Sequence, residues 1–128
     1  MESYATLNYT RGEEQNRGQT RPANRVPPLN GQVGASWRLP RDFLIEPYVL
    51  LADRQERLDD DDLSDLRINP RGSAGWASAN LRLGWKPDAR SRLQLDLKNL
   101  LDQSYREHGS GIDAAGFGAT VTAELRFD

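Results

Sequence analysis

The densest run of ionisable side chains in this sequence is acidic. Four aspartates are consecutive at Asp59–Asp62, and Asp65 follows closely. Carboxylates at this density can bind Ca²⁺, but an EF-hand loop needs alternating ligands, a Gly at its sixth position and a Glu at its twelfth. Counted from Asp59, those positions hold Ser64 and Pro70. The run therefore predicts a solvated surface loop, with a loose divalent-cation or lipopolysaccharide-bridging role as the alternative. Its candidates for ligand contact are Asp59, Asp61 and Asp65.

A general acid–base mechanism would have to use His108, because it is the only histidine. Asp102 or Asp113 could orient its ring, and Ser104 or Ser110 could act as a nucleophile. No strand–turn–helix elbow presents either serine, and the chain has no cysteine for thiolate chemistry. We therefore expect that the chain is not an enzyme, and that His108 is a candidate for ligand contact in a surface loop.

The segment Gly109–Ala114 fits the pattern G-x-G-x-x-A. A dinucleotide site also needs a helix directly after the glycines, within a βαβ unit of about thirty residues. Alternating apolar and polar residues follow instead, so we expect no cofactor and interpret the glycines as part of a turned loop.

Composition narrows the function further. The 128 residues carry 17 basic and 19 acidic side chains, a net charge of −2, so we expect no nucleic-acid partner. The sequence has no run of 18 apolar residues, so it predicts no transmembrane helix. The first residues have neither a basic nor an apolar stretch, so we expect no secretory signal in this chain.

The elements that position these side chains are predicted to be strands. Apolar residues recur at every second position in five segments, which is the period of a half-exposed strand. A sixth segment, 44–54, is less regular, because Pro47 and the run Val49–Leu51 interrupt the alternation. Residues 93–101 also fit helical spacing, but their neighbours favour a strand. The sequence predicts an all-β fold, an antiparallel up-and-down meander of about six long strands. The segments are 5–10, 29–39, 44–54, 76–85, 93–101 and 117–127.

The connections between these segments alternate in length. Long loops are predicted at 12–28, 55–75 and 107–116, and short turns at 40–42 and 87–92. All long loops then lie at one end of the sheet. This asymmetry is typical of bacterial outer-membrane barrels, which have long extracellular loops and short periplasmic turns.

The aromatic residues fall into two bands along the predicted strands, as expected of rings at the two membrane interfaces. Only Tyr48 lies in mid-strand. The long-loop band holds Tyr9, Trp76, Tyr105 and Phe117, and the short-turn band holds Tyr4, Trp37, Phe43, Trp85 and Phe127.

Alternation also predicts which side chains face lipid. One continuous apolar face should hold Ala79, Leu81, Leu83, Leu93, Leu95, Leu97, Val121, Ala123 and Leu125. The opposite face, toward a hydrated lumen, should hold Ser78, Asn80, Arg82, Gln94, Asp96, Lys98, Thr120, Thr122, Glu124 and Arg126. An Arg on the lipid face at the bilayer midplane destabilises a barrel by about 2–4 kcal/mol. The face that carries Arg82 and Arg126 is therefore predicted to be the lumen face.

Residues 97–113 contain a more specific pattern. Asn99-Leu100-Leu101-Asp102 is followed by Tyr105 and then by His108-Gly109-Ser110. This block resembles the penultimate strand and last loop of TonB-dependent outer-membrane receptors. Further segments are similar to other parts of the same barrel, namely Arg25–Leu29, Asp65–Pro70, Gly75-Trp76, Asn80–Arg82 and the closing Ala123–Phe127.

The resemblance implies a segment of a 22-stranded barrel in the Gram-negative outer membrane, with its C-terminus in the periplasm. Family members import scarce ligands such as siderophore-bound iron, haem or cobalamin. The family's plug domain and its contact with TonB correspond to nothing in these residues, so we expect residues 1–128 to be the C-terminal strands of a longer barrel. Asp128 departs from the family, whose last residue is usually aromatic. The alternatives are a soluble antiparallel β module that binds a ligand or partner, and a small structural outer-membrane barrel.

Overall fold

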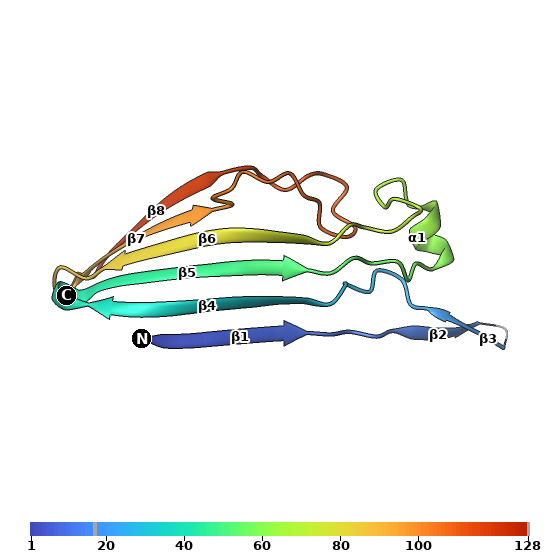
Figure 1. Ribbon diagram of the computed structural model, residues 1–128, viewed down its shortest axis with the longest axis horizontal. Helices are drawn as coiled ribbons and strands as arrows, with labels where there is room; N and C mark the ends of the chain where they lie inside the picture. The colour runs from blue at the N-terminus through green and yellow to red at the C-terminus, as the bar shows by residue number, and fades with distance from the viewer. Residues whose placement is uncertain (17, 128) are drawn as a thin grey trace.

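The computed structural model describes residues 1–16 and 18–127, so Asp128 lies outside the described residues. Its main element is a six-stranded antiparallel sheet in which the strands lie side by side in chain order (Figure 1). This confirms the predicted all-β meander. The strands are β1 (Glu2–Asn8), β4 (Asn30–Leu39), β5 (Phe43–Ala52), β6 (Trp76–Trp85), β7 (Ser91–Lys98) and β8 (Gly118–Leu125).

The register of the strands confirms the predicted faces. Leu83 pairs with Leu95, which pairs with Val121, so these three side chains share one face. Arg82 pairs with Asp96 on the opposite face. The apolar face continues into the earlier strands through Ala5, Gly31, Val33, Trp37, Leu39, Phe43, Ile45, Pro47, Val49 and Leu51. Arg126 follows the end of β8 and is not part of the described strand.

Burial on the two faces is the reverse of that in a soluble protein. Ser78 and Asn80 on the polar face are 2% and 3% exposed, whereas Val121 and Leu7 on the apolar face are 73% and 69% exposed. Among the described residues, the buried hydrophobic side chains are only Tyr48, Ala52 and Ile68. Soluble domains bury their large apolar residues and expose the polar ones, so this sheet presents its apolar face to its surroundings.

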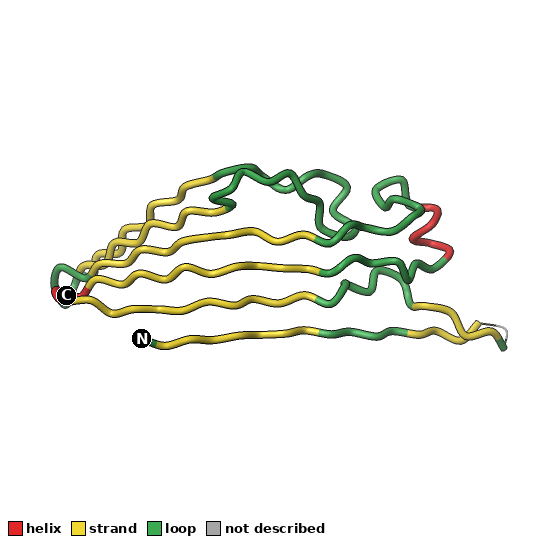
Figure 2. The backbone as a smooth tube through the Cα atoms, in the orientation of Figure 1, coloured by secondary structure: helices red, strands yellow, loops and turns green. Residues whose placement is uncertain are grey.

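The connections follow the predicted alternation in length (Figure 2). At one end, the 3₁₀ turn η1 (Pro40–Asp42) joins β4 to β5, with Arg41 and Asp42 at φ of 65° and 58°. At the same end, Asp88 closes the β6–β7 turn by accepting hydrogen bonds from the amide of Arg90 (2.8 Å) and the hydroxyl of Ser91 (3.1 Å). These bonds hold the pKa of Asp88 below its usual value.

Two of the segments expected to be plain loops contain secondary structure. Residues 12–28 include the hairpin β2 (Glu13–Asn16) and β3 (Gln19–Pro22), and residues 55–75 include the short helix α1 (Asp60–Ser64). The hairpin strands lack apolar alternation, and α1 is too short for a helical period, so neither has a signal in the hydropathy pattern. No helix in the described part of the chain is long and apolar enough to cross a membrane.

Candidate functional site

Hydrogen bonds and ion pairs cross the polar face of the sheet over five strands. Gln32 donates to the hydroxyl of Tyr4 at 2.9 Å, and that hydroxyl donates to Glu46 at 2.7 Å. Arg82 then joins Glu46, at 3.3 Å, to Asp96, at 2.9 Å. Because the strands place these groups at matching register, each charge on this part of the face has an opposite charge beside it.

Two further contacts hold the centre of this network. Gln94 donates to the second carboxylate oxygen of Asp96 at 2.6 Å. The guanidinium of Arg82 also lies over the ring of Tyr48, 5.6 Å from its centroid. A cation held by two carboxylates and an aromatic face is fixed in place, so Arg82 is the central residue of the polar face.

The Asn-Leu-Leu-Asp block closes the end of β7. Asn99 is 2% exposed and has a φ of 50°. Its side-chain Nδ2 donates to the carbonyls of Gln103 (2.9 Å) and Ala115 (3.2 Å), and its Oδ1 accepts from the backbone amide of Gln103 (3.0 Å). Asp102 accepts from the amide of Phe117 at 2.8 Å, next to the start of β8. The motif therefore positions the last loop and strand.

The acidic run is not a uniformly solvated loop, because Asp59 and Asp62 are buried. Asp59 caps α1 by accepting hydrogen bonds from the amides of Asp61 (2.7 Å) and Asp62 (2.9 Å). Asp62 completes the capping box and is 1% exposed. Its other oxygen accepts from the amide of Arg25 at 3.2 Å, so the run attaches α1 to the segment after β3. Charge density alone does not reveal this capping role.

Ion pairs attach the loop containing α1 to the loop containing the hairpin. Arg21 pairs with Asp60, and Arg57 pairs with Glu13 at 3.2 Å. Asp65 accepts hydrogen bonds from the side chain and the amide of Arg67, which hold the pKa of that carboxyl well below its usual range. Arg25 lies 3.5 Å from the same carboxylate. The predicted candidates thus divide into the buried cap Asp59, the paired Asp65 and the exposed Asp61.

His108 connects the last long loop to the loop that contains α1. Its Nδ1 lies 2.8 Å from the hydroxyl of Ser73, and its Nε2 is buried without a hydrogen-bond partner among the described residues. It lines a hollow of about 280 Å³ together with Trp76. The ring of Trp76 stacks on Tyr105 at 4.3 Å. This arrangement places the only histidine beside an aromatic pair at the end of the sheet that carries the long loops.

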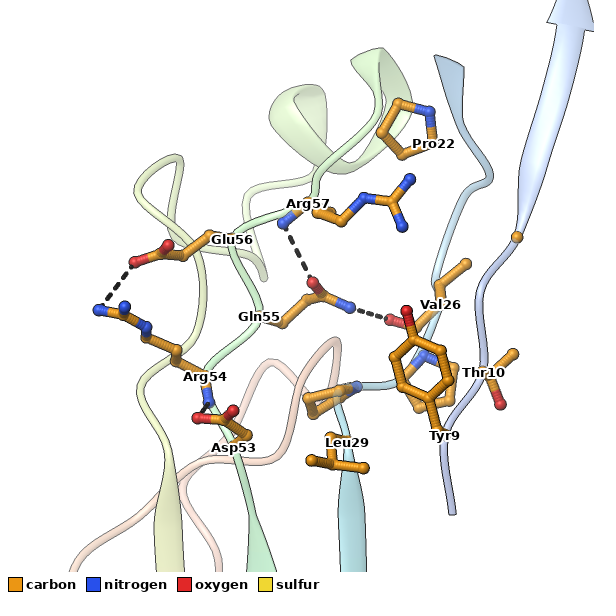
Figure 3. Close-up of a pocket in the computed structure, with 13 residues that line it drawn as sticks. Tyr9, Thr10, Pro22, Val26, Leu29, Asp53, Arg54, Gln55, Glu56 and Arg57 are labelled. Atoms are coloured by element: carbon orange, nitrogen blue, oxygen red, sulfur yellow. Dashed lines mark hydrogen bonds and ion pairs between the residues drawn. The ribbon is translucent and has the colours of Figure 1, made fainter. Parts of the chain in front are cut away.

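A second hollow, of about 300 Å³, lies between the first two long loops (Figure 3). Gln55 holds its walls together, donating to the carbonyl of Val26 at 2.7 Å and accepting from the amide of Arg57 at 3.0 Å. Tyr9 and Val26 give it apolar surface. Its charged lining is balanced, because Asp53 and Glu56 lie beside Arg54 and Arg57, and Arg54 pairs with Glu56 at 3.3 Å. Gln55 was not among the predicted residues, because an isolated glutamine between charged residues has no pattern to mark it.

The predicted interface aromatics occupy different faces. Trp37 and Trp85 lie on the apolar face, where Trp85 stacks on Phe43 at 5.4 Å. Trp76 pairs with Ala52 and shares the polar face with Ser78 and Asn80, next to Tyr105. Among the predicted interface aromatics, Tyr9, Phe117 and Phe127 are the most exposed.

Comparison with known proteins supports the fold. No family model matches the chain, and no curated protein matches it. The chain is similar to the solved structure of the copper transporter OprC, with a TM-score of 0.80 and 20% sequence identity. The match covers 96% of this chain and 20% of that one, so this chain spans about a fifth of the length of the structure that it resembles. Within the described residues, no group of three or more His, Cys, Asp or Glu side chains is arranged to hold a metal ion.

Proposed function

We propose that this chain is the C-terminal part of the β-barrel of a TonB-dependent receptor in the Gram-negative outer membrane. The observation that carries the proposal is the reversed burial of the sheet, with exposed leucines and valines on one face and a buried, paired polar network on the other. Lipid outside and a hydrated lumen inside account for both faces. A soluble β module would have to leave the same apolar face in water.

The role that we propose is energy-coupled uptake of a scarce ligand. The structural similarity to a copper transporter supports transport, and it agrees with the expectation that the chain is not an enzyme. The Asn99–Asp102 block supports the narrower family assignment. Contact with TonB would be made by an N-terminal part outside these residues, and the short turns and the C-terminus would face the periplasm.

We propose a metal chelate or a similar small molecule as the ligand, with siderophore-bound iron, haem and cobalamin as the classes to test. The similar protein transports copper, which favours a metal-containing ligand. In this chain the accessible ligand contacts would come from Asp61 and from the hollow beside His108.

The orientation of the sheet in lipid can be tested with its three tryptophans. We would prepare single-tryptophan variants by replacing the other two with Phe, and insert each into vesicles containing brominated lipid. Trp37 and Trp85 lie on the apolar face and should be strongly quenched. Trp76 lies on the polar face and serves as the internal control, so it should keep most of its fluorescence. Equal quenching of all three tryptophans would contradict the proposal. Solubility of the protein in buffer that contains neither vesicles nor detergent would also contradict it.

A further inference from the structure

The hollow beside His108, of about 280 Å³, lies at the end of the sheet that carries the long loops. The start of β4, the end of β5 and the first residue of β6 line it on the sheet side. Its other lining residues are Pro27-Pro28, at the end of the first long loop, and Glu107-His108, in the last one. Two long loops of this chain therefore enclose the hollow together with the sheet.

The lining is apolar apart from one free carboxylate. The side chain of Asn30 is fully occupied, because its Nδ2 donates to the carbonyl of Pro28 at 2.9 Å and its Oδ1 accepts from Asn8 at 3.2 Å. His108 is held by its contact with Ser73. Glu107 is exposed, and its carboxylate forms no hydrogen bond or ion pair with any other described residue. The hollow thus offers one unpaired acceptor beside apolar surface.

The charge of Glu107 is not balanced by a lining cation, because no lysine or arginine of the described chain lines this hollow. The arginines within two residues of the lining pair with other acidic side chains, namely Arg25 with Asp65, Arg54 with Glu56 and Arg106 with Asp113. A carboxylate or phosphate on a ligand would therefore meet a negative charge here and no positive one.

We propose that this hollow binds a protonated amine carried on an apolar group of about the size of one aromatic ring. Trp76 is fixed by stacking on Tyr105 at 4.3 Å and lines the hollow, so its indole can attract a cation. Glu107 can accept charge-assisted hydrogen bonds from an ammonium group. Leu50 and the two prolines supply contact for the apolar group.

The volume of the hollow is close to the lower limit for small-molecule sites, so it suits one group of a larger ligand. The inference rests on the proposed function, since it takes the long-loop end of the sheet to face the outside of the cell. It narrows the transported ligand to one that carries an amine beside an apolar group.

The probes are three molecules that share a phenyl ring and differ in charge, namely 2-phenylethylammonium, 2-phenylethanol and 3-phenylpropanoate. Each is titrated at pH 7 into the variant W37F/W85F in neutral detergent, and the fluorescence of Trp76 is recorded. The ammonium probe should bind saturably. The alcohol should bind about fivefold more weakly, because it lacks both charge contacts, and the carboxylate more weakly still. The variant W76F/W85F, which keeps Trp37 on the apolar face, reports partition of the probes into detergent and should show no saturable change.

Glu107→Gln, made in the W37F/W85F background, should reduce the affinity for the ammonium probe by about threefold or more, as expected for a partly exposed ion pair. It should leave the affinity for the alcohol nearly unchanged. The matched control is Glu14→Gln, which removes the same charge from an exposed position in β2 and should bind all three probes like its parent.

Equal affinity for the three probes would overturn the inference, and so would equal affinity for the ammonium probe in E107Q and E14Q. The comparison of probes needs no substitution in the hollow, so it does not depend on how well E107Q assembles. Insertion into vesicles is checked by the tryptophan quenching described above. A chain that inserts but does not prefer the ammonium probe refutes only this inference, whereas one that does not insert refutes the proposed function.

Discussion

At the scale of single residues, several of the most buried polar side chains, such as Asp62 and Asn99, hold loops together. Asn99 has a left-handed backbone conformation, and both its side-chain Nδ2 and its Oδ1 form hydrogen bonds. Asn adopts this conformation more readily than most residues, because its short polar side chain can hydrogen-bond locally. The type of residue at this position is therefore set by both backbone and side-chain requirements.

Replacing Asn99 with Ala should destabilise the protein by at least about 2 kcal/mol, because it removes buried hydrogen bonds and places a Cβ-bearing residue with no local hydrogen bond at positive φ. Asn99→Gly should recover part of the loss by relieving the backbone. Unfolding in denaturant measures both effects. Asn69→Ala is the control, because Asn69 is exposed and its side chain accepts a single local hydrogen bond, from the amide of Arg71. A loss as large in N69A as in N99A would contradict the assignment.

Asp65 predicts a pH dependence that is confined to one loop. Its pKa is lowered in the folded state, so its contribution to stability is fully present above the pKa of the unfolded chain, about 3.9. That contribution is lost as the pH falls toward the lower folded pKa. The amide of Arg67 donates to Asp65 at 2.9 Å, so its hydrogen-exchange protection reports on this bond directly.

Protection of the Arg67 amide should stay constant from pH 7 to about 4 and decrease at lower pH. In Asp65→Asn the protection should be weaker at pH 7 and should not show the same acid loss. Exchange of the Leu95 amide, within β7, serves as the internal reference. Constant protection of the Arg67 amide in wild-type protein down to pH 2 would contradict the prediction. The Leu95 amide, measured in the same samples, shows that exchange is detected at that pH.

At the scale of elements, the register makes the two faces of β7 and β8 directly comparable. Leu95 pairs with Val121 on the apolar face, and Gln94 pairs with Thr122 on the polar face. Adjacent residues of β8 therefore differ in their surroundings and hardly at all in their position along the strand.

Leu95→Arg or Val121→Arg should impair assembly in the membrane, at a cost of about 2–4 kcal/mol near the bilayer midplane. Thr122→Arg is the matched control on the same strand and should be tolerated, because its side chain faces the polar network. The fraction of protein that becomes heat-modifiable and protease-resistant in outer membranes measures assembly. Similar behaviour of V121R and T122R would contradict the barrel assignment of this sheet.

At the scale of the whole molecule, the period-two pattern was sufficient to predict the sheet, its strand order and both faces. The same pattern places Trp76 on the polar face, because Trp76 is two residues from Ser78, whereas Ala77 lies on the apolar face. It could not predict the β2–β3 hairpin or the capping role of Asp59 and Asp62, because these depend on contacts between loops that are distant in sequence.

The last prediction concerns the two edge strands of the sheet, β1 and β8. Within the described chain, β1 pairs only with β4, and β8 pairs only with β7. Lipid cannot supply hydrogen bonds to the remaining edge groups, so further strands of a longer barrel should cover them.

Amide hydrogen exchange should therefore be compared between this chain, kept monomeric in excess detergent, and a longer protein that contains these residues together with the proposed further strands. Amides of β5 and β6 have partners on both sides and should be similarly protected in both samples. Amides of β1 and β8 should exchange about tenfold or more slowly in the longer protein, because both of their edges are then paired. Equal protection of β1 and β8 in the two samples would show that these edges need no further strands, and the chain would then not be a barrel segment.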